Sequence, residues 1–179
     1  MCVIIYKPAG VKMPPRDTLV AAFRANPHGC GFSAPSCSFK GLSFATFMNK
    51  IRAVKDSEPC IIHFRLATHG SIKPTNCHPF KRGGVTFAHN GILDIAPVSD
   101  RTDSETAFIK YIYPAIKAYG WRSVEANAVI NEIVGFSKFA LMYRDDVKLY
   151  GNFVRRDDGC YYSNLRFEYY ERSALKRVV

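Results

Sequence analysis

Three short β-prone segments near the C-terminus are separated only by turns, and this spacing constrains the fold more than any other feature. The segments span residues 138–143, 147–153 and 159–163, and Arg-Asp-Asp tripeptides at 144–146 and 156–158 join them. Connections this short permit antiparallel pairing, whereas parallel strands need a crossover of a dozen or more residues. The C-terminal third is therefore predicted to form antiparallel strands.

The rest of the chain mixes strands and helices without a repeating order. Hydrophobic periodicity predicts strands at 2–7, 29–34, 59–67 and 84–93, and helices at 17–25, 44–54, 103–118 and 123–134. Asp17 is the expected N-cap of the first helix. Because the order is not βαβα, it favours an α+β domain in which helices cover antiparallel sheets. No Walker or Rossmann glycine-rich phosphate loop is present.

Length and composition set the class of protein. A chain of 179 residues suits one domain with a sizeable core, spanning 1–179. The first residues lack the pattern of a signal peptide, and no apolar run reaches the roughly 18 residues of a membrane span. A cytoplasmic protein without membrane contact is expected. The 6 cysteines include no CxxC pair, so we expect reduced thiols, no metal site and no cofactor.

The net charge of +10 leaves two interpretations open. The basic residues are dispersed, and their clusters are as short as Lys81-Arg82, Arg155-Arg156 and Lys176-Arg177. Solvated surface charge explains this pattern, and a nucleic-acid partner is the alternative. No nucleic-acid-binding motif accompanies the charge.

Cys2 is the first candidate catalytic residue. Removal of Met1 would leave one residue with both a thiol and a free α-amine, whose pKa values lie near ~8.5 and ~8. The amine can then act as a built-in base for the thiol nucleophile. The structural alternative is that Cys2 begins a buried strand, since Val3-Ile4-Ile5-Tyr6 is apolar and β-prone.

Four later segments carry further candidate residues. Arg65 ends a buried strand, where its planar guanidinium suits a carboxylate, in a substrate or in a structural ion pair. Asn90-Gly91 interrupts an apolar strand. The pair either forms a hairpin turn or supplies an amide side chain and a backbone N–H to an oxyanion hole. Either Thr102, which has capping-box spacing to Glu105, or Asp103 would cap the helix that begins here, and the alternative role of Asp103 is to hold a substrate ammonium.

Cys77 beside His78 suggests a cysteine protease, but adjacent residues seldom face each other productively. Packing and turn roles explain the His78-Pro79-Phe80 segment better. The four segments and Cys2 are each explicable by structure when taken alone.

Taken together and in order, the motifs resemble the class II glutamine amidotransferase domain, a branch of the N-terminal-nucleophile hydrolases. They are Cys2, the segment His63-Phe64-Arg65-Leu66-Ala67-Thr68-His69-Gly70, then His89-Asn90-Gly91 and Thr102-Asp103-Ser104-Glu105. The stretch Asn26-Pro27-His28-Gly29-Cys30-Gly31-Phe32 also resembles the Asn-Pro-Asp-Gly-Trp-Gly of stand-alone members. The resemblance implies a four-layer αββα sandwich of two antiparallel sheets.

The resemblance also implies residue roles. Cys2 would attack the glutamine side-chain amide and form a thioester, while Asn90 and Gly91 would stabilise the oxyanion. Arg65 would bind the α-carboxylate and Asp103 the α-ammonium. Thr68 and His69 would line the same end of the substrate.

The sequence departs from the family pattern in ways that leave the substrate open. Val3 follows the nucleophile where glycine is common, Leu66 stands where some members carry tryptophan, and His28 and Cys30 replace Asp and Trp. No synthase domain follows the motifs, so ammonia would pass to a separate acceptor enzyme or into solution. The alternatives are cleavage of another γ-glutamyl amide, or a catalytically silent binding subunit with this fold.

Overall fold

The computed structural model describes residues 2–67, 70–98 and 101–175, with side chains up to residue 171. Its strands are β1 (Val3–Lys7), β2 (Cys30–Ser33), β3 (Ser38–Gly41), β4 (Cys60–Phe64), β5 (Phe80–Arg82), β6 (Val85–Asn90), β7 (Lys138–Tyr143), β8 (Asp146–Tyr150), β9 (Val154–Arg155) and β10 (Tyr161–Tyr162). Its helices are α1 (Arg16–Ala25), α2 (Phe44–Lys50), α3 (Asp103–Ala107), α4 (Tyr113–Tyr119), α5 (Val124–Val134) and α6 (Glu168–Leu175). Two 3₁₀ turns, η1 (Ile51–Ala53) and η2 (Pro74–Asn76), and a π-helical turn, η3 (Phe108–Ile112), complete it.

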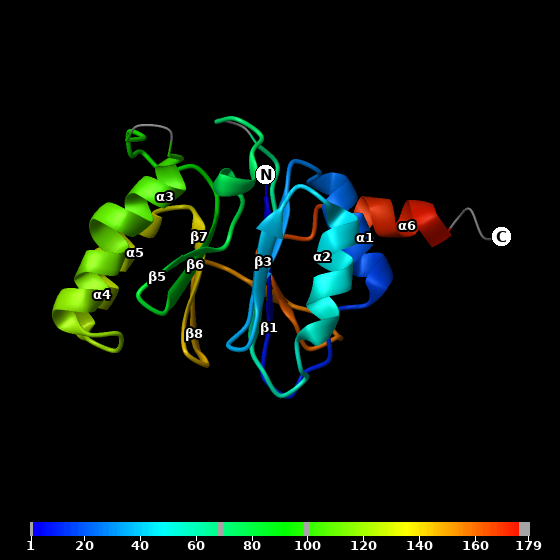
Figure 1. Ribbon diagram of the computed structural model, residues 1–179, viewed down its shortest axis with the longest axis horizontal. Helices are drawn as coiled ribbons and strands as arrows, with labels where there is room; N and C mark the ends of the chain where they lie inside the picture. The colour runs from blue at the N-terminus through cyan, green and yellow to red at the C-terminus, as the bar shows by residue number, and fades with distance from the viewer. Residues whose placement is uncertain (1, 68–69, 99–100, 176–179) are drawn as a thin grey trace.

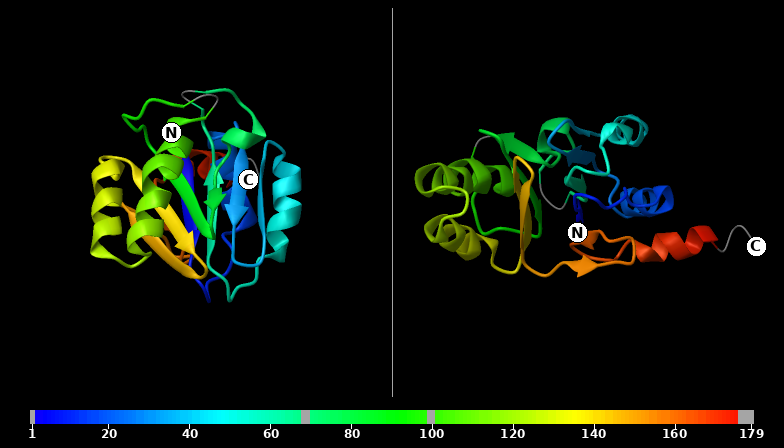
Figure 2. Two further views of the ribbon diagram at one scale, coloured as in Figure 1. Left: turned by 60° about the vertical axis from the view of Figure 1, so that its left-hand side comes forward. Right: turned by 90° about the horizontal axis from the view of Figure 1, so that it is seen from below.

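The strands form two antiparallel sheets that face each other between two layers of helices (Figure 1). One sheet has the strand order β3-β2-β4-β1-β10-β9, and the other has the order β5-β6-β7-β8. Helices α1, α2 and α6 lie outside the first sheet, and α3, α4 and α5 cover the second (Figure 2). The predicted α+β class and four-layer αββα sandwich are confirmed.

Each helix layer has its own hydrophobic core. Phe47 and Phe64 pack with ring centroids 5.2 Å apart under α2, and Phe87 stacks on Phe108 at 5.2 Å under the other helix layer. Burying one such ring stabilises the fold by about 1.5–3 kcal/mol. A smaller cluster fills the space between the sheets: Ile4, Ile61, Ala88, Ala140 and Met142. Large aromatic rings therefore pack between each sheet and its helices, and smaller side chains pack between the two sheets.

Strand alternation places three predicted site residues in the layer between the sheets. Successive side chains of a strand point to opposite faces. Strands β1, β4 and β6 each give one residue to the inter-sheet cluster: Ile4, Ile61 and Ala88. Positions two or four residues away share that face, so the side chains of Cys2, Arg65 and Asn90 also belong to this layer.

The helix predicted over 103–118 is continuous but irregular. It consists of α3, the π-helical turn η3 and α4 in succession. Pro114, in the first turn of α4, has no N–H to donate to the preceding turn, and the helix widens directly before it.

One predicted cap is wrong, and four elements were not predicted. The N-cap of α1 is Pro15, without a side-chain cap bond, and Asp17 lies in the first turn instead. There its charge complements the helix dipole. The elements without a sequence prediction are β3, β5, β9 and α6. The three strands have two to four residues each, too few to show a period.

Candidate active site

Four predicted site residues line one cavity of about 260 Å³ between the sheets: Cys2, Arg65, Gly91 and Asp103. They come from the start of β1, the end of β4, the end of β6 and the start of α3. A larger cavity of about 590 Å³, between β3 and β5, contains none of the predicted residues. The smaller cavity is singled out by its chemistry, since it combines a thiol, a cation and a carboxylate.

The Cys2 thiol is bound by the backbone of the residue after Arg65. Its Sγ accepts a hydrogen bond from Leu66 N at 3.3 Å and lies 3.6 Å from Leu66 O. Burial raises the pKa of the Cys2 thiol, while the Leu66 backbone and the positive charge of Arg65 act in the opposite direction. A thiol with a raised pKa needs a base before it can attack. Because the contact is to backbone, leucine in place of tryptophan at position 66 does not remove it.

Arg65 is almost fully buried, with 4% of its surface exposed. Its Nη1 donates to Ser71 O at 3.1 Å, and its backbone N donates to Gly29 O at 2.8 Å. His28 reaches the same loop, since its Nδ1 accepts from Ala67 N at 3.0 Å. The 26–29 turn thus fixes the loop that carries Arg65.

Asn90 and Gly91 end strand β6 and do not form a hairpin turn, because the partner strand β7 follows only after α3, α4 and α5. Gly91 has a φ of 150°, and a side chain here would overlap Ser137 Oγ. Only glycine fits this position. Asn90 is buried, and its Nδ2 donates to Ser163 Oγ at 2.8 Å.

Asp103 is engaged on both carboxylate oxygens. Oδ2 accepts from Leu93 N at 3.1 Å, and Oδ1 accepts from Ser104 N at 2.7 Å and Ser104 Oγ at 3.1 Å. The N-cap of α3 is Thr102, whose side chain accepts from Glu105 N, so the predicted cap is present beside Asp103.

His89 is connected to Asp103 through Ser104. His89 Nδ1 lies 2.7 Å from Ser104 Oγ, and the Ser104 hydroxyl donates to Asp103. Nδ1 therefore carries the hydrogen, and Nε2 keeps its lone pair. Burial lowers the pKa of His89 to about 4, although the charge of Asp103 opposes this shift. A neutral imidazole thus lines the cavity, and Ser104 is a site residue that the motif did not single out.

His63 and His78 extend this group of buried imidazoles. Their ring centroids are 4.4 Å apart, and His63 Nε2 lies 3.0 Å from His89 O. Burial lowers the pKa of His63 to about 3 and that of His78 well below its ordinary value. Within the described residues, both ring nitrogens of His78 lack a hydrogen-bond partner.

Cys77 is a buried structural residue rather than a nucleophile. It is 0% exposed, and its thiol lies 3.5 Å from Gly41 O. Burial raises the pKa of the Cys77 thiol. The structure therefore argues against a protease site at Cys77-His78.

Two residues after β10 contact the site, although nothing in the sequence pointed to them. Asn164 Nδ2 donates to Cys2 O at 2.8 Å, and Ser163 Oγ accepts a hydrogen bond from the Asn90 side-chain amide. Both are short polar residues in a loop, where a single sequence gives no signal. Met1, Thr68 and His69 lie outside the described residues, so their roles stay predictions.

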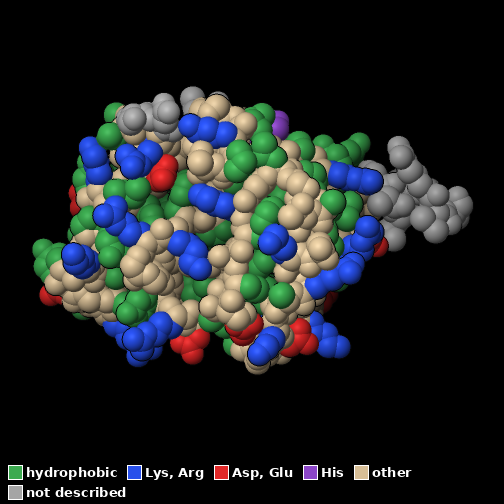
Figure 3. Space-filling model, in the orientation of Figure 1, with side chains coloured by type: hydrophobic (Ala, Val, Ile, Leu, Met, Phe, Trp, Pro, Cys, Tyr) green, Lys and Arg blue, Asp and Glu red, His purple; other side chains and the backbone are tan. Residues whose placement is uncertain are grey.

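Lysine and arginine side chains are scattered over the face shown in Figure 3 and do not form one block. This distribution matches the dispersed charge of the sequence, and a nucleic-acid partner stays a prediction. Among the helices of the described residues, none has the length and apolar content for crossing a membrane. In the same part of the chain, no group of three or more His, Cys, Asp or Glu side chains is arranged to hold a metal ion.

Comparison with known proteins identifies the family. Residues 32–138 match the class-II glutamine amidotransferases, which is more than half of the chain. The fold is similar to glutamine phosphoribosylpyrophosphate amidotransferase from B. subtilis, with a TM-score of 0.54 and 16% sequence identity. The match covers 90% of this chain and 41% of that one, so the chain spans less than half the length of that protein. No curated protein matches in sequence.

The cavity and the matched segment agree on one class of enzyme, the amidohydrolases of the N-terminal-nucleophile fold. The chain belongs to the class-II glutamine amidotransferase family. Hydrolysis of the glutamine amide is the general reaction of that family.

Proposed function

We propose that this chain is a single amidotransferase domain over residues 1–179 that releases ammonia from glutamine through Cys2, after removal of Met1. One observation carries the proposal: a thiol, a guanidinium, a carboxylate and a glycine backbone converge on one cavity. These four groups suit attack on a side-chain amide, binding of the two charged ends of a free amino acid, and stabilisation of the oxyanion.

Recognition of the amino-acid end rests on opposite charges. The Arg65 guanidinium suits bidentate binding of the α-carboxylate. Asp103 serves the α-ammonium, since a carboxylate offers about four acceptor sites and three are occupied by Leu93 N, Ser104 N and Ser104 Oγ. Thr68 and His69 would complete this end of the site. This arrangement favours free glutamine over the glutamine side chain of a protein.

The chemistry proceeds through a thioester. The α-amine of mature Cys2 takes the thiol proton, and the sulfur bonds to the amide carbon. The amine then returns a proton to the leaving nitrogen, so that the C–N bond breaks and ammonia leaves. Water attacks the thioester, which releases glutamate and regenerates the thiol.

The oxyanion of each tetrahedral intermediate would be stabilised by Gly91 N–H and the Asn90 amide. Donors of this kind act strongly because burial excludes water, and removing one typically costs about 2.7–4 kcal/mol. Asn90 is 4% exposed, which fits such a donor.

Ammonia released here would go to a separate acceptor enzyme, and no metal or cofactor takes part in the proposed steps.

A second substrate class is favoured by one observation. The cavity is also lined by apolar side chains beyond Gly91: Ile92, Leu93, Ile95 and Pro97. These would suit a γ-glutamyl amide with an apolar substituent on nitrogen.

Intact-mass measurement with a glutamine-mimicking diazoketone tests the proposal. Loss of Met1 and one adduct, blocked by glutamine and absent in Cys2→Ala, is the expected result. An adduct that is blocked only by an N-substituted γ-glutamyl amide would favour the second substrate class. Retained Met1 with no adduct would contradict the mechanism through an N-terminal cysteine and would favour a catalytically silent binding subunit.

A further inference from the structure

Ser163 connects the two sheets next to the candidate active site. It follows β10 in the first sheet, and its side chain is buried, with 1% of the residue exposed. Its Oγ accepts from Ile4 N at 2.8 Å, and its own backbone N donates to Ile4 O at 2.9 Å. The same Oγ lies 2.8 Å from Asn90 Nδ2 on β6 of the second sheet. One hydroxyl thus joins the nucleophile strand to the asparagine of the proposed oxyanion hole.

The hydrogen bonds of Asn90 are incomplete in this orientation. Its Oδ1 is buried and, within the described chain, has no hydrogen-bond partner. A serine hydroxyl can accept two hydrogen bonds and donate one, whereas an amide has one oxygen that accepts and one nitrogen that donates. Half a turn of the amide would let the Ser163 hydroxyl donate to Oδ1, while still accepting from Ile4 N. Nδ2 would then be released from Ser163 and could donate elsewhere.

We propose that Ser163 is a positioning residue that fixes the Asn90 amide for oxyanion binding, an inference that rests on the proposed function. Among the described residues, Ser163 is the only side chain that is hydrogen-bonded to the Asn90 amide. With Oδ1 held by Ser163, both Nδ2 hydrogens become available as charge develops on the substrate oxygen. The Ser163 hydroxyl thereby links the orientation of the Asn90 amide to stabilisation of the substrate oxyanion.

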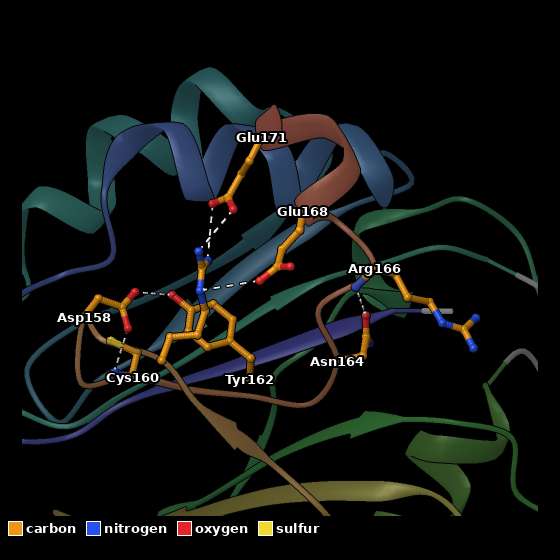
Figure 4. Close-up of polar contacts among 8 residues, drawn as sticks. Asp158, Cys160, Tyr162, Asn164, Arg166, Glu168 and Glu171 are labelled. Carbon is orange, nitrogen blue, oxygen red and sulfur yellow. Dashed lines mark hydrogen bonds and ion pairs between the residues drawn. The ribbon is translucent and has the colours of Figure 1, made fainter. Parts of the chain in front are cut away.

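The segment that carries Ser163 is anchored by polar contacts on both sides (Figure 4). Arg156 pairs with Glu171 at 3.2 Å and with Glu168 at 3.9 Å, which ties the turn between β9 and β10 to helix α6. Asn164 Oδ1 accepts from Arg166 N at 3.2 Å, while its Nδ2 holds Cys2 O. A hydroxyl on an anchored segment can fix its partner more closely than one on an unrestrained loop.

The variant Ser163→Ala tests the inference by separating kcat from KM for the hydrolysis of glutamine. We expect kcat to fall by about 10²-fold, the loss that a misplacement of about 1 Å produces, with KM unchanged. Ser33→Ala is the matched control, because the buried Ser33 hydroxyl also joins the two sheets, through Thr86 Oγ1 at 3.2 Å. The control should lose stability and keep kcat. An equal kcat loss in both variants would reduce Ser163 to a structural role.

A double-mutant cycle with Asn90→Ala shows whether the two residues act as one unit. If Ser163 acts through Asn90, Ser163→Ala should cost little once Asn90 has been replaced. Losses that multiply in the double variant would overturn the inference.

An NMR measurement keeps the inference testable without catalysis. The Asn90 side-chain NH₂ resonance is assigned by its disappearance in Asn90→Asp and compared in Ser163→Ala. A changed shift and faster hydrogen exchange support positioning by Ser163, and an unchanged resonance overturns it. If Ser163→Ala does not fold, kcat is measured in Ser163→Cys, which keeps the size of the side chain and makes only weak hydrogen bonds: a lowered kcat supports the inference, and an unchanged kcat overturns it. Wild-type protein that hydrolyses no γ-glutamyl amide overturns the proposed function instead, so the two failures are distinguishable.

Discussion

A polar side chain stands at each end of strand β1, the buried Lys7 and the partly buried Cys2 that precedes the strand, and the two ends are built differently. At one end, Lys7 is 0% exposed, and its Nζ is surrounded by four backbone carbonyls. They belong to Pro8, Lys55, Asp56 and Glu58, at 2.7–3.3 Å. At the other end, Cys2 opens onto a cavity of about 260 Å³. Near it, buried polar atoms of His78, His89 and Asn90 lack partners in the described residues.

This difference distinguishes a structural site from the candidate active site. A buried polar group without a partner costs about 1–3 kcal/mol, so most proteins leave few of them. At the Lys7 end, every donor has an acceptor and nothing is left for a ligand. At the Cys2 end, His78 and His89 line the cavity, and their ring nitrogens without a partner in the described residues are left for a substrate.

The largest effect on stability is expected from Lys7→Met. The substitution removes the charged donor and leaves several carbonyls of the 55–58 turn without a partner. Since a hydrogen bond to a charged group contributes about 1.5–3 kcal/mol, we expect a loss of roughly 3–5 kcal/mol in unfolding free energy. Urea unfolding measures it. Lys12→Met, at an exposed position, is the control and should be nearly neutral.

If Lys7→Met were as stable as the control, the four carbonyls around Lys7 would not contribute to stability. The Lys7 end of β1 would then not be a structural site. Folded Lys7→Met should still retain KM for glutamine, because Lys7 lies at the opposite end of β1.

At the open end, Arg65→Lys should act on binding rather than on folding. Lysine keeps the charge but loses the planar fork that matches a carboxylate. We expect kcat/KM for glutamine to fall by roughly 10²-fold, largely through KM, because hydrogen bonds between charged groups contribute about 1.5–3 kcal/mol. Steady-state kinetics measure it. A variant that lost stability and kept KM would place Arg65 with Lys7 as a structural residue.

Several parts of the fold follow from the sequence. Turns of three residues predicted antiparallel pairing of the last strands, and β7 and β8 do pair across Arg144-Asp145. The helices at 44–54 and 123–134 were visible from their apolar faces. The pairing order could not be predicted, because β1 lies between β4 and β10, which are distant in sequence.

The candidate site was predictable only where its residues form contiguous motifs. Arg65, Gly91 and Asp103 each lie in a run that resembles the family, and the structure brings them to one cavity with Cys2. Ser163 and Asn164 were not predictable, because their contacts with Asn90 and Cys2 depend on packing of the two sheets.

The buried histidines give the open end a distinct dependence on pH. His63, His78 and His89 are neutral in the folded protein, since burial lowers each pKa. In the unfolded chain, a histidine has a pKa near ~6.5 and binds a proton as the pH falls below it. Unfolding therefore takes up protons, and stability decreases as the pH falls from about 6.5 toward the folded-state values.

The smallest of the predicted effects isolates His78, whose ring packs against Phe80 with centroids 4.5 Å apart. His78→Phe removes one titrating group and keeps an aromatic ring in the cluster. Between pH 7 and pH 5, wild-type protein should lose about 2 kcal/mol more stability than the variant, at 1.36 kcal/mol per pKa unit. Urea unfolding at both pH values measures this difference. Phe80→Leu disturbs the same packing without removing a proton-binding group, so its pH dependence should equal that of the wild type. An equal dependence in His78→Phe would mean that His78 binds its proton in the folded protein as it does in the unfolded chain, so that burial does not keep the ring neutral.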